Sequence, residues 1–152
     1  MTPYYRPATL DDIDDLAPRI RLADVEEVYA IAKIGMHQAL TMSFHDSLEV
    51  NSIVAPDGEV IGMFGVTDTQ DPLLFSVWML CSDRLPEISR PFLRQSKEWV
   101  KKKNASYPIL YNYVDARNTK AIQWLKYLGF VFVQRMDNFG FGRKTFYEFV
   151  RI

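Results

Sequence analysis

The chain has 152 residues, of which 48% are hydrophobic and 14% aromatic, and its formal net charge is −1. This length and composition indicate a single domain over residues 1–152 with its own core, and they exclude a disordered chain. The near-zero charge gives no support for direct nucleic-acid binding. Cys81 is the only cysteine, so no disulfide can form within the chain. There is no signal-type start and no apolar run of roughly 20 residues, so we expect a cytoplasmic protein without a membrane anchor.

Turn residues, helix caps and apolar spacing divide the chain into helices and strands. Thr9 followed by aspartates is a typical helix start, and Pro56-Asp57-Gly58-Glu59 supplies the turn of a hairpin. In chain order, these signals predict a strand at 4–8, a helix at 9–20 interrupted near Pro18, helical structure at 24–48 broken near Gly35, strands at 51–56, 59–68 and 73–82, a helix ending near 104, a strand at 109–114, a short helix ending at 129, and strands at 130–135 and 145–152.

The segment Leu73–Ser82 is apolar at almost every position, which is typical of a strand buried on both faces. We therefore expect it to be the central strand of a sheet, covered by helices on each side. The next helix has a buried stripe that includes Phe92 and Trp99, and it ends in a run of lysines that suits the negative end of a helix dipole.

The residues from Asn112 to Phe130 form the most specific pattern. A strand is followed by a short helix, which Asn118 can cap and which ends at Gly129, because glycine takes the left-handed conformation without strain. An ordinary core helix between two strands fits this pattern too. The order Val114-x-x-x-Asn118-x-x-Ala121-Ile122-x-x-Leu125-x-x-x-Gly129-Phe130 also resembles the last conserved motif of the GCN5-related N-acetyltransferases, the GNAT family.

The order of the predicted elements is similar to that family over roughly residues 6–152. The resemblance implies an α/β (α+β) fold of the GNAT acyl-CoA N-acyltransferase type. That fold has a central mixed, mostly antiparallel sheet, helices on both faces, and parallel fourth and fifth strands that splay apart. The resemblance also implies acetyl-CoA as cosubstrate, with its pantetheine arm between the strands at 73–82 and 109–114.

The same resemblance indicates which residues bind the cosubstrate. A backbone N–H near Leu80 or Cys81 is expected to polarise the thioester carbonyl, and the N-terminus of the following helix is expected to face the pyrophosphate. The family's glycine-containing loop, Arg/Gln-x-x-Gly-x-Gly/Ala, is replaced here by Arg84-Leu-Pro-Glu-Ile-Ser-Arg-Pro, in which Glu87 adds a negative charge. The expected cofactor-binding set is therefore Leu80, Cys81, Arg84, Ser89, Arg90 and Asn118.

The sequence does not identify a catalytic residue. The predicted fourth strand has no carboxylate that could act as a base. The tyrosine that many family members place seven residues after the motif asparagine is Leu125 here. Tyr127 lies about 200° around the helix from that position, so the role of general acid does not transfer to it.

Two functions follow from these resemblances. The first is an N-acetyltransferase that moves acetyl from acetyl-CoA to a primary amine of a small molecule or a host protein. The chain is also similar to small acyltransferase-like proteins of short-tailed lytic phages, which share the altered phosphate loop. The alternative is therefore a protein that has lost catalysis and binds a partner in the host cytoplasm or in the virion. The aromatic turn at 138–143 is a candidate contact with a ligand or with a second subunit of a homodimer.

Several other residues have a structural and a functional interpretation. Asp24, Glu26 and Glu27 form either a solvated helix start or an acidic lip that attracts a basic acceptor. His37 and His45 share a helical face but have no third ligand, so we expect no metal site. We expect core positions for Cys81, Trp78, Trp99 and Trp124.

Overall fold

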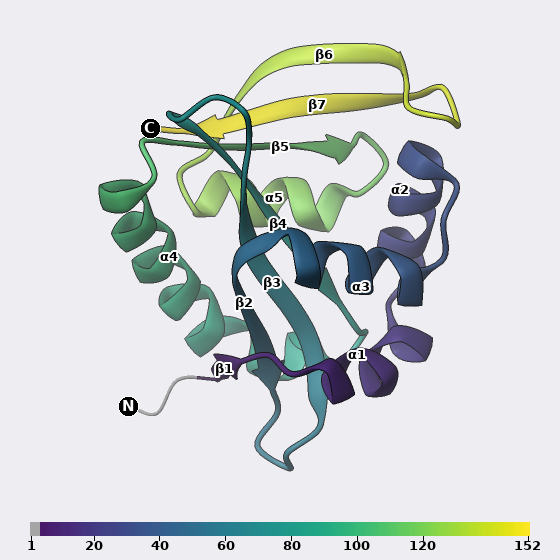
Figure 1. Ribbon diagram of the computed structural model, residues 1–152, viewed down its shortest axis with the longest axis vertical. Coiled ribbons are helices and arrows are strands. Elements are labelled where there is room, and N and C mark those ends of the chain that lie inside the picture. Colours follow the sequence, from purple (N-terminus) through teal and green to yellow (C-terminus); the bar gives the residue numbers. More distant parts are fainter. Residues whose placement is uncertain (1–3) are drawn as a thin grey trace.

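Strand β4 (Leu74–Cys81) lies at the centre of a seven-stranded sheet with the order β1-β2-β3-β4-β5-β7-β6. The computed structural model describes residues 4–152 (Figure 1). All neighbouring strands are antiparallel except β4 and β5, which are parallel. The other elements are β1 (Tyr5–Pro7), α1 (Leu10–Leu16), the 3₁₀ turn η1 (Ala17–Arg19), α2 (Leu22–Ala32), α3 (Met36–Asp46), β2 (Ser47–Val54), β3 (Val60–Asp68), the 3₁₀ turn η2 (Leu85–Ile88), α4 (Ser89–Ser106), β5 (Ile109–Asp115), α5 (Thr119–Tyr127), β6 (Val131–Phe139) and β7 (Lys144–Arg151).

Side chains along β4 alternate between two hydrophobic cores, one on each face of the sheet. Val77, Met79 and Cys81 pack in the core that contains the buried residues of α4. Trp78 and Leu80 pack in the other core, with residues of α1 and α3. Figure 1 shows α3 crossing in front of the strands β3 and β4. The continuous apolar sequence of β4 thus reflects burial on both faces, which confirms its predicted central place.

The pairing between β4 and β5 stops partway along the two strands. The last register pair joins Ser76 to Tyr111, although both strands continue for several residues. Just beyond this pair, Asn112 Nδ2 donates a hydrogen bond to the carbonyl oxygen of Val77 over 2.7 Å, so a side chain replaces the next backbone contact. The predicted GNAT-type fold with splayed parallel strands is confirmed.

Strand β2 begins at Ser47, four residues before the predicted start at Asn51. Glu49 explains the extension, because its carboxylate accepts hydrogen bonds from Lys103 Nζ at 2.6 Å and from the Tyr107 hydroxyl at 2.8 Å. These contacts tie the start of β2 to the end of α4, which local sequence signals cannot reveal. The preceding helix α3 ends accordingly at Asp46.

Strand β6 extends to Phe139 instead of ending near Arg135. The ring of Phe139 packs against Tyr113 and Phe146, with ring centroids 4.7 Å and 4.9 Å apart. This aromatic contact keeps the end of β6 on the sheet and shortens the turn to β7.

The prediction of one domain over residues 1–152 includes residues 1–3, which lie outside the described part of the chain. Within residues 4–152, no helix combines the length and the apolar character needed to cross a membrane.

A buried ionic contact joins the start of the chain to the sheet. Asp12, which is 6% exposed, accepts hydrogen bonds from Arg6 Nη1 at 2.7 Å, from the Thr9 N–H at 2.9 Å and from the Ser52 hydroxyl at 2.8 Å. Burial alone raises the pKa of a carboxyl group, but these donors outweigh it and lower the pKa of Asp12 to about 2. The carboxylate therefore links β1, α1 and β2.

We predict that Asp12→Asn lowers the free energy of unfolding by about 1–3 kcal/mol, the usual cost of losing hydrogen bonds to a buried charged group. Because the folded-state pKa is lowered, this stabilisation is present above pH 4 and is lost as the pH falls towards 2. Chemical denaturation at pH 7 and at pH 3 measures both effects. Asp11→Asn, at an exposed neighbour in the same helix, is the matched control. Equal stability of the two variants contradicts the prediction.

Candidate functional site

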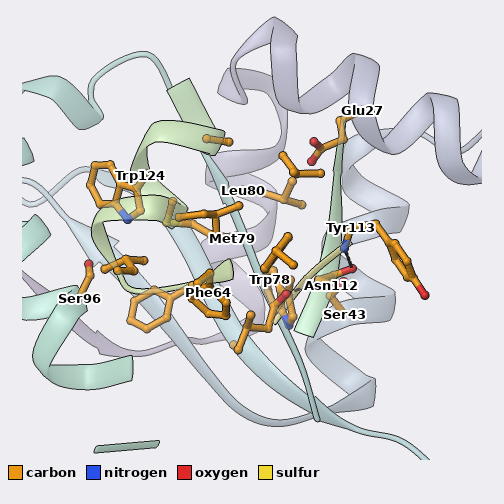
Figure 2. A pocket seen from close by; sticks show the side chains of 18 of the residues that line it. Glu27, Ser43, Phe64, Trp78, Met79, Leu80, Ser96, Asn112, Tyr113 and Trp124 are labelled. Atoms are coloured by element: carbon orange, nitrogen blue, oxygen red, sulfur yellow. Dashed lines mark hydrogen bonds between the residues drawn. The ribbon is translucent and has the colours of Figure 1, made fainter. Parts of the chain in front are cut away.

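A cavity of about 300 Å³ lies where β4 and β5 diverge. Because the gap passes through the sheet, residues from both faces line it (Figure 2). One end is formed by α4 and α5, with Phe92, Trp99 and Trp124. The other end, which we call the α2 end, is formed by Glu27, Val28, Ile31, Ile34, Trp78 and Tyr113.

Glu27 is the only charged side chain that lines the cavity within residues 4–152. It lies on α2, and its Oε1 accepts a hydrogen bond from the N–H of Asp115 at 2.7 Å and a long one from Asn118 Nδ2 at 3.5 Å. Burial raises the pKa of Glu27 to about 7; the Asp115 N–H opposes this rise, and the nearby carboxylate of Asp24 adds to it. Near neutral pH this carboxyl group can therefore both accept and release a proton.

The turn between β6 and β7 holds the helix that carries Glu27. The N–H groups of Phe141 and Gly142 donate hydrogen bonds to the last carbonyls of α2, on Ile31 at 3.0 Å and on Ala30 at 2.7 Å. A side chain on Gly140 would place its Cβ 2.7 Å from the Ala30 carbonyl oxygen, and the φ angle there is +70°, so glycine is required for this close contact. The aromatic turn therefore contacts α2 of its own chain, and its contact with a ligand or a second subunit stays a prediction.

Asp24 and Asn118 belong to a buried polar network beside the cavity. Arg21 Nη2 donates to Asp24 Oδ1 and to Asn118 Oδ1, both at 2.8 Å. Asn118 Nδ2 returns a bond to Asp24 Oδ1 at 3.3 Å. The Asn118 side chain makes no cap bond to the helix that follows it, in contrast to the predicted capping role. It instead joins the start of α5 to α2.

The exposed edge of β4 offers a different donor from the expected ones. Ser82 N–H donates to Ile61 O on β3, and backbone groups alternate along a strand, so the Leu80 N–H also points to β3. The Cys81 N–H points to the opposite edge, where it donates to Asp24 Oδ2 at 3.1 Å. By the same alternation the Met79 N–H faces the divergence from β5, beyond the last register pair.

The Cys81 side chain is buried, at 3% exposure, and lies on the core side as expected. Burial raises the pKa of its thiol far above the ordinary range, and the Asp24 carboxylate adds to this increase. Such a thiol does not ionise at neutral pH, which argues against a nucleophilic role.

The segment expected to bind phosphate folds into the turn η2, whose backbone bonds are internal. Three N–H groups each donate a hydrogen bond to the carbonyl three residues earlier in the chain: Leu85 to Ser82, Glu87 to Arg84 and Ser89 to Pro86. Pro86 and Pro91 have no N–H to offer. A helix N-terminus attracts anions through its unpaired N–H groups, and most of those in this segment are already paired.

Arg84 is also engaged. Its guanidinium makes two bonds to Glu87, at 2.8 Å and 2.9 Å, and lies 3.0 Å from Asp57 and 3.4 Å from Glu59. Three carboxylates thus surround one cation. Ser89 stands at the start of α4 and Arg90 is exposed beside it, so Arg90 is the more accessible cation of the expected pair.

Other predicted positions agree with the structure. Leu125 lines the cavity, whereas Tyr127 is 42% exposed and its ring lies 4.7 Å from Lys97 Nζ. Trp78, Trp99 and Trp124 pack against the two cores, and all three also line the cavity.

No family model matches the chain, and no curated protein sequence matches it. Solved structures do match. A GNAT-family acetyltransferase from Bacillus anthracis has a TM-score of 0.71 at 7% identity over 97% of this chain and 93% of that one. The chain has the GNAT acetyltransferase fold. A GCN5-related N-acetyltransferase from Kribbella flavida gives 0.68 at 16% identity, over 97% and 95% of the two chains. A GNAT phosphinothricin acetyltransferase from Sinorhizobium meliloti, in complex with AcCoA, gives 0.68 at 17% identity, over 99% and 88%.

The residues around the divergence fit one part of acetyl-CoA better than the other. The open edge at Met79 and the apolar walls suit an extended thioester arm, which can add to the sheet like a short strand. The turn η2 and the neutralised Arg84 provide little for the pyrophosphate. An extended thioester arm would therefore fit between the strands, whereas a nucleotide would meet few free donors at η2.

The sequence analysis placed Glu27 with Asp24 and Glu26, either in a solvated helix start or in an acidic lip that attracts a basic acceptor, and it did not single out Glu27 as a catalytic candidate. The helical spacing of the residues in α2 is the sequence signal that could have identified Glu27. Glu27, Val28 and Ile31 recur at helical spacing on one side of α2 and all three line the cavity, whereas Glu26 is exposed. A carboxylate on the apolar face of a helix is the feature that marks the site.

We predict that S-acetylpantetheine and acetyl-CoA bind with dissociation constants within about tenfold of each other, a difference below about 1.4 kcal/mol. Thermal unfolding with each ligand, or calorimetric titration, measures this. Glu87→Gln removes a negative charge beside Arg84 and should strengthen acetyl-CoA binding without changing the affinity for S-acetylpantetheine. Glu98→Gln, an exposed change on α4, is the control. A preference for acetyl-CoA of a hundredfold or more in the unmodified protein contradicts the closed turn seen here.

Proposed function

We propose that this protein transfers an acyl group from a CoA-type thioester to the nitrogen of a primary amine. The observation that carries the proposal is the Glu27 carboxyl group, which faces the same cavity as the open edge of β4 and has a pKa raised to about 7. A site residue with a pKa near the working pH is suited to general base catalysis. The fold supports the proposal, because the structures it resembles are acetyltransferases.

Each residue of the site has a separate role in this reaction. Acetyl-CoA, when bound, would supply the acetyl group as an activated thioester. The C–N bond forms as the C–S bond breaks, and the leaving thiolate takes up the proton that the acylated nitrogen loses. The Met79 N–H is placed to donate to an oxygen between the strands, and so to stabilise negative charge there. Glu27 accepts the proton that an ammonium group must lose before its nitrogen can attack. The Asp115 N–H fixes the Glu27 carboxylate at 2.7 Å, and the apolar walls exclude water.

We predict that Glu27→Gln lowers kcat/KM for acetyl transfer by about 10²- to 10⁴-fold, the usual contribution of a general base. The side chain keeps its size, so the melting temperature should change little. Glu26→Gln, one position away on the exposed face of α2, is the matched control and should keep full activity. Equal activity of the two variants removes Glu27 from the mechanism.

The same group predicts the pH dependence of the reaction. A base must be deprotonated to act, so kcat/KM should rise with pH through an apparent pKa of about 7 and level off above it. The effect on stability has the opposite sign, because the pKa of Glu27 in the folded state is raised. The contribution of Glu27 to the free energy of unfolding therefore falls as the pH rises from 4.5 to above 7. In Glu27→Gln the rising limb of the rate profile should be absent, and its persistence assigns that limb to another group.

The second candidate function is a binding protein that keeps the fold without catalysis and acts on a protein partner in a host cell or in a virion. The closed turn η2 is the observation that favours it. The N–H groups of Leu85, Glu87 and Ser89 are bonded within the turn, as expected for a protein that no longer needs them to bind a phosphate.

One comparison separates the two functions. If neither acetyl-CoA nor S-acetylpantetheine at millimolar concentration raises the melting temperature of the folded protein, the transferase proposal fails. Recovery of a single stoichiometric partner from host lysate, without an acetylated product, then supports the binding function.

A further inference from the structure

The α2 end of the cavity has one charged group and a wall of apolar side chains. Within residues 4–152, Glu27 is the only charged residue among those lining the cavity. The surrounding surface comes from Val28 and Ile31 on α2, from Ile34 just after this helix, and from Trp78 on β4. Figure 2 shows Glu27, Leu80, Trp78 and Tyr113 around this end. The polar groups that remain here, on Ser43 and Tyr113, are uncharged at neutral pH.

The neighbouring acidic residues do not change this charge count. Asp24 is paired with Arg21 at 2.8 Å, and Asp115 is paired with Arg117 at 2.7 Å. Each of these carboxylates is thus matched by a guanidinium of the protein. Glu148 lies opposite Tyr113 on the neighbouring strand β7, with its carboxylate close enough to raise the pKa of the Tyr113 hydroxyl, but it does not line the cavity. Among the lining residues that the structure describes, the carboxylate of Glu27 is the one left for a ligand.

We infer that the acceptor is a primary monoamine carried on an apolar body, and that diamines and polyamines are poor acceptors. This inference rests on the proposed function, in which the amine nitrogen lies beside Glu27. The ammonium group pairs with Glu27, while the remainder of the molecule covers Ile31, Ile34 and Trp78. Apolar surface removed from water stabilises the complex in proportion to its area. A second ammonium group, in contrast, finds no further carboxylate among the described residues that line the cavity, and it loses its hydration on entering.

A homologous series of ligands tests this inference without an acyl donor. Binding of propylamine, butylamine, pentylamine and hexylamine is measured by calorimetric titration, or by the fluorescence of Trp78 and its neighbours. Each added methylene should tighten binding about fourfold, which corresponds to about 0.8 kcal/mol. The pair pentylamine and 1,4-diaminobutane has the same number of heavy atoms, and the diamine should bind at least tenfold more weakly.

Two pairs of variants locate the binding. Ile31→Ser should weaken hexylamine binding severalfold, whereas Leu22→Ser, on the same helix, exposed and away from the cavity, should leave it unchanged. Glu27→Gln should weaken all the monoamines, whereas Glu26→Gln should not. Each control reports any general loss of folding caused by changes in α2.

The outcomes separate this inference from the proposed function. Monoamine binding that follows the series, without acetyl transfer, supports the inference and counts against the transferase. Transfer to 1,4-diaminobutane in preference to pentylamine overturns the inference while supporting the transferase. Affinity that does not change with chain length, or absence of monoamine binding at millimolar concentration, also overturns it.

Discussion

The end of the pairing between β4 and β5 is the constraint on which the rest of the site depends. Two strands that diverge inside a sheet leave backbone groups without their usual partners, and buried N–H and C=O groups need hydrogen bonds. Here side chains supply them. Asn112 Nδ2 donates to the Val77 carbonyl at the start of the divergence, and Asp24 accepts from the Cys81 N–H at its far end. Met79 lies between these two points, so the open edge is short and in a fixed place.

The same contacts determine the electrostatics of the site. Asp24 is held at the end of β4 by the Cys81 N–H and is neutralised by Arg21. Glu27, one turn further along α2, has an N–H partner but no cation, and burial raises its pKa to about 7. Two acidic residues three positions apart on one helix thus have different roles, because within residues 4–152 Asp24 forms a direct ion pair with a guanidinium and Glu27 does not. The first holds the structure together, and the second remains available for a ligand.

Sequence patterns predicted those parts of the fold that depend on local chemistry and burial. The uninterrupted apolar run identified β4 as central, and the motif ending at Gly129 identified β5 and α5 and, through the family resemblance, the splay. The contacts missed were long-range. The role of Asn118 depends on Arg21, 97 positions away, and the early start of β2 depends on contacts of Glu49 with Lys103 and Tyr107. Glu27 was not singled out as a catalytic candidate, because its pKa depends on burial that only the fold creates.

The turn η2 shows the physical consequence of replacing the glycine-containing loop of the GNAT family by a segment without glycine. Without glycine, and with prolines at 86 and 91, the segment closes its own backbone bonds, and Arg84 binds three carboxylates. Reopening it for a phosphate gives up backbone bonds worth about 0.5–1.5 kcal/mol each. It also breaks the exposed ion pairs of Arg84, which solvent screens. New phosphate contacts must first offset these losses, so the turn yields little net affinity. A thioester ligand would therefore gain its affinity mainly where β4 and β5 diverge, because the structure has an open strand edge and apolar walls there.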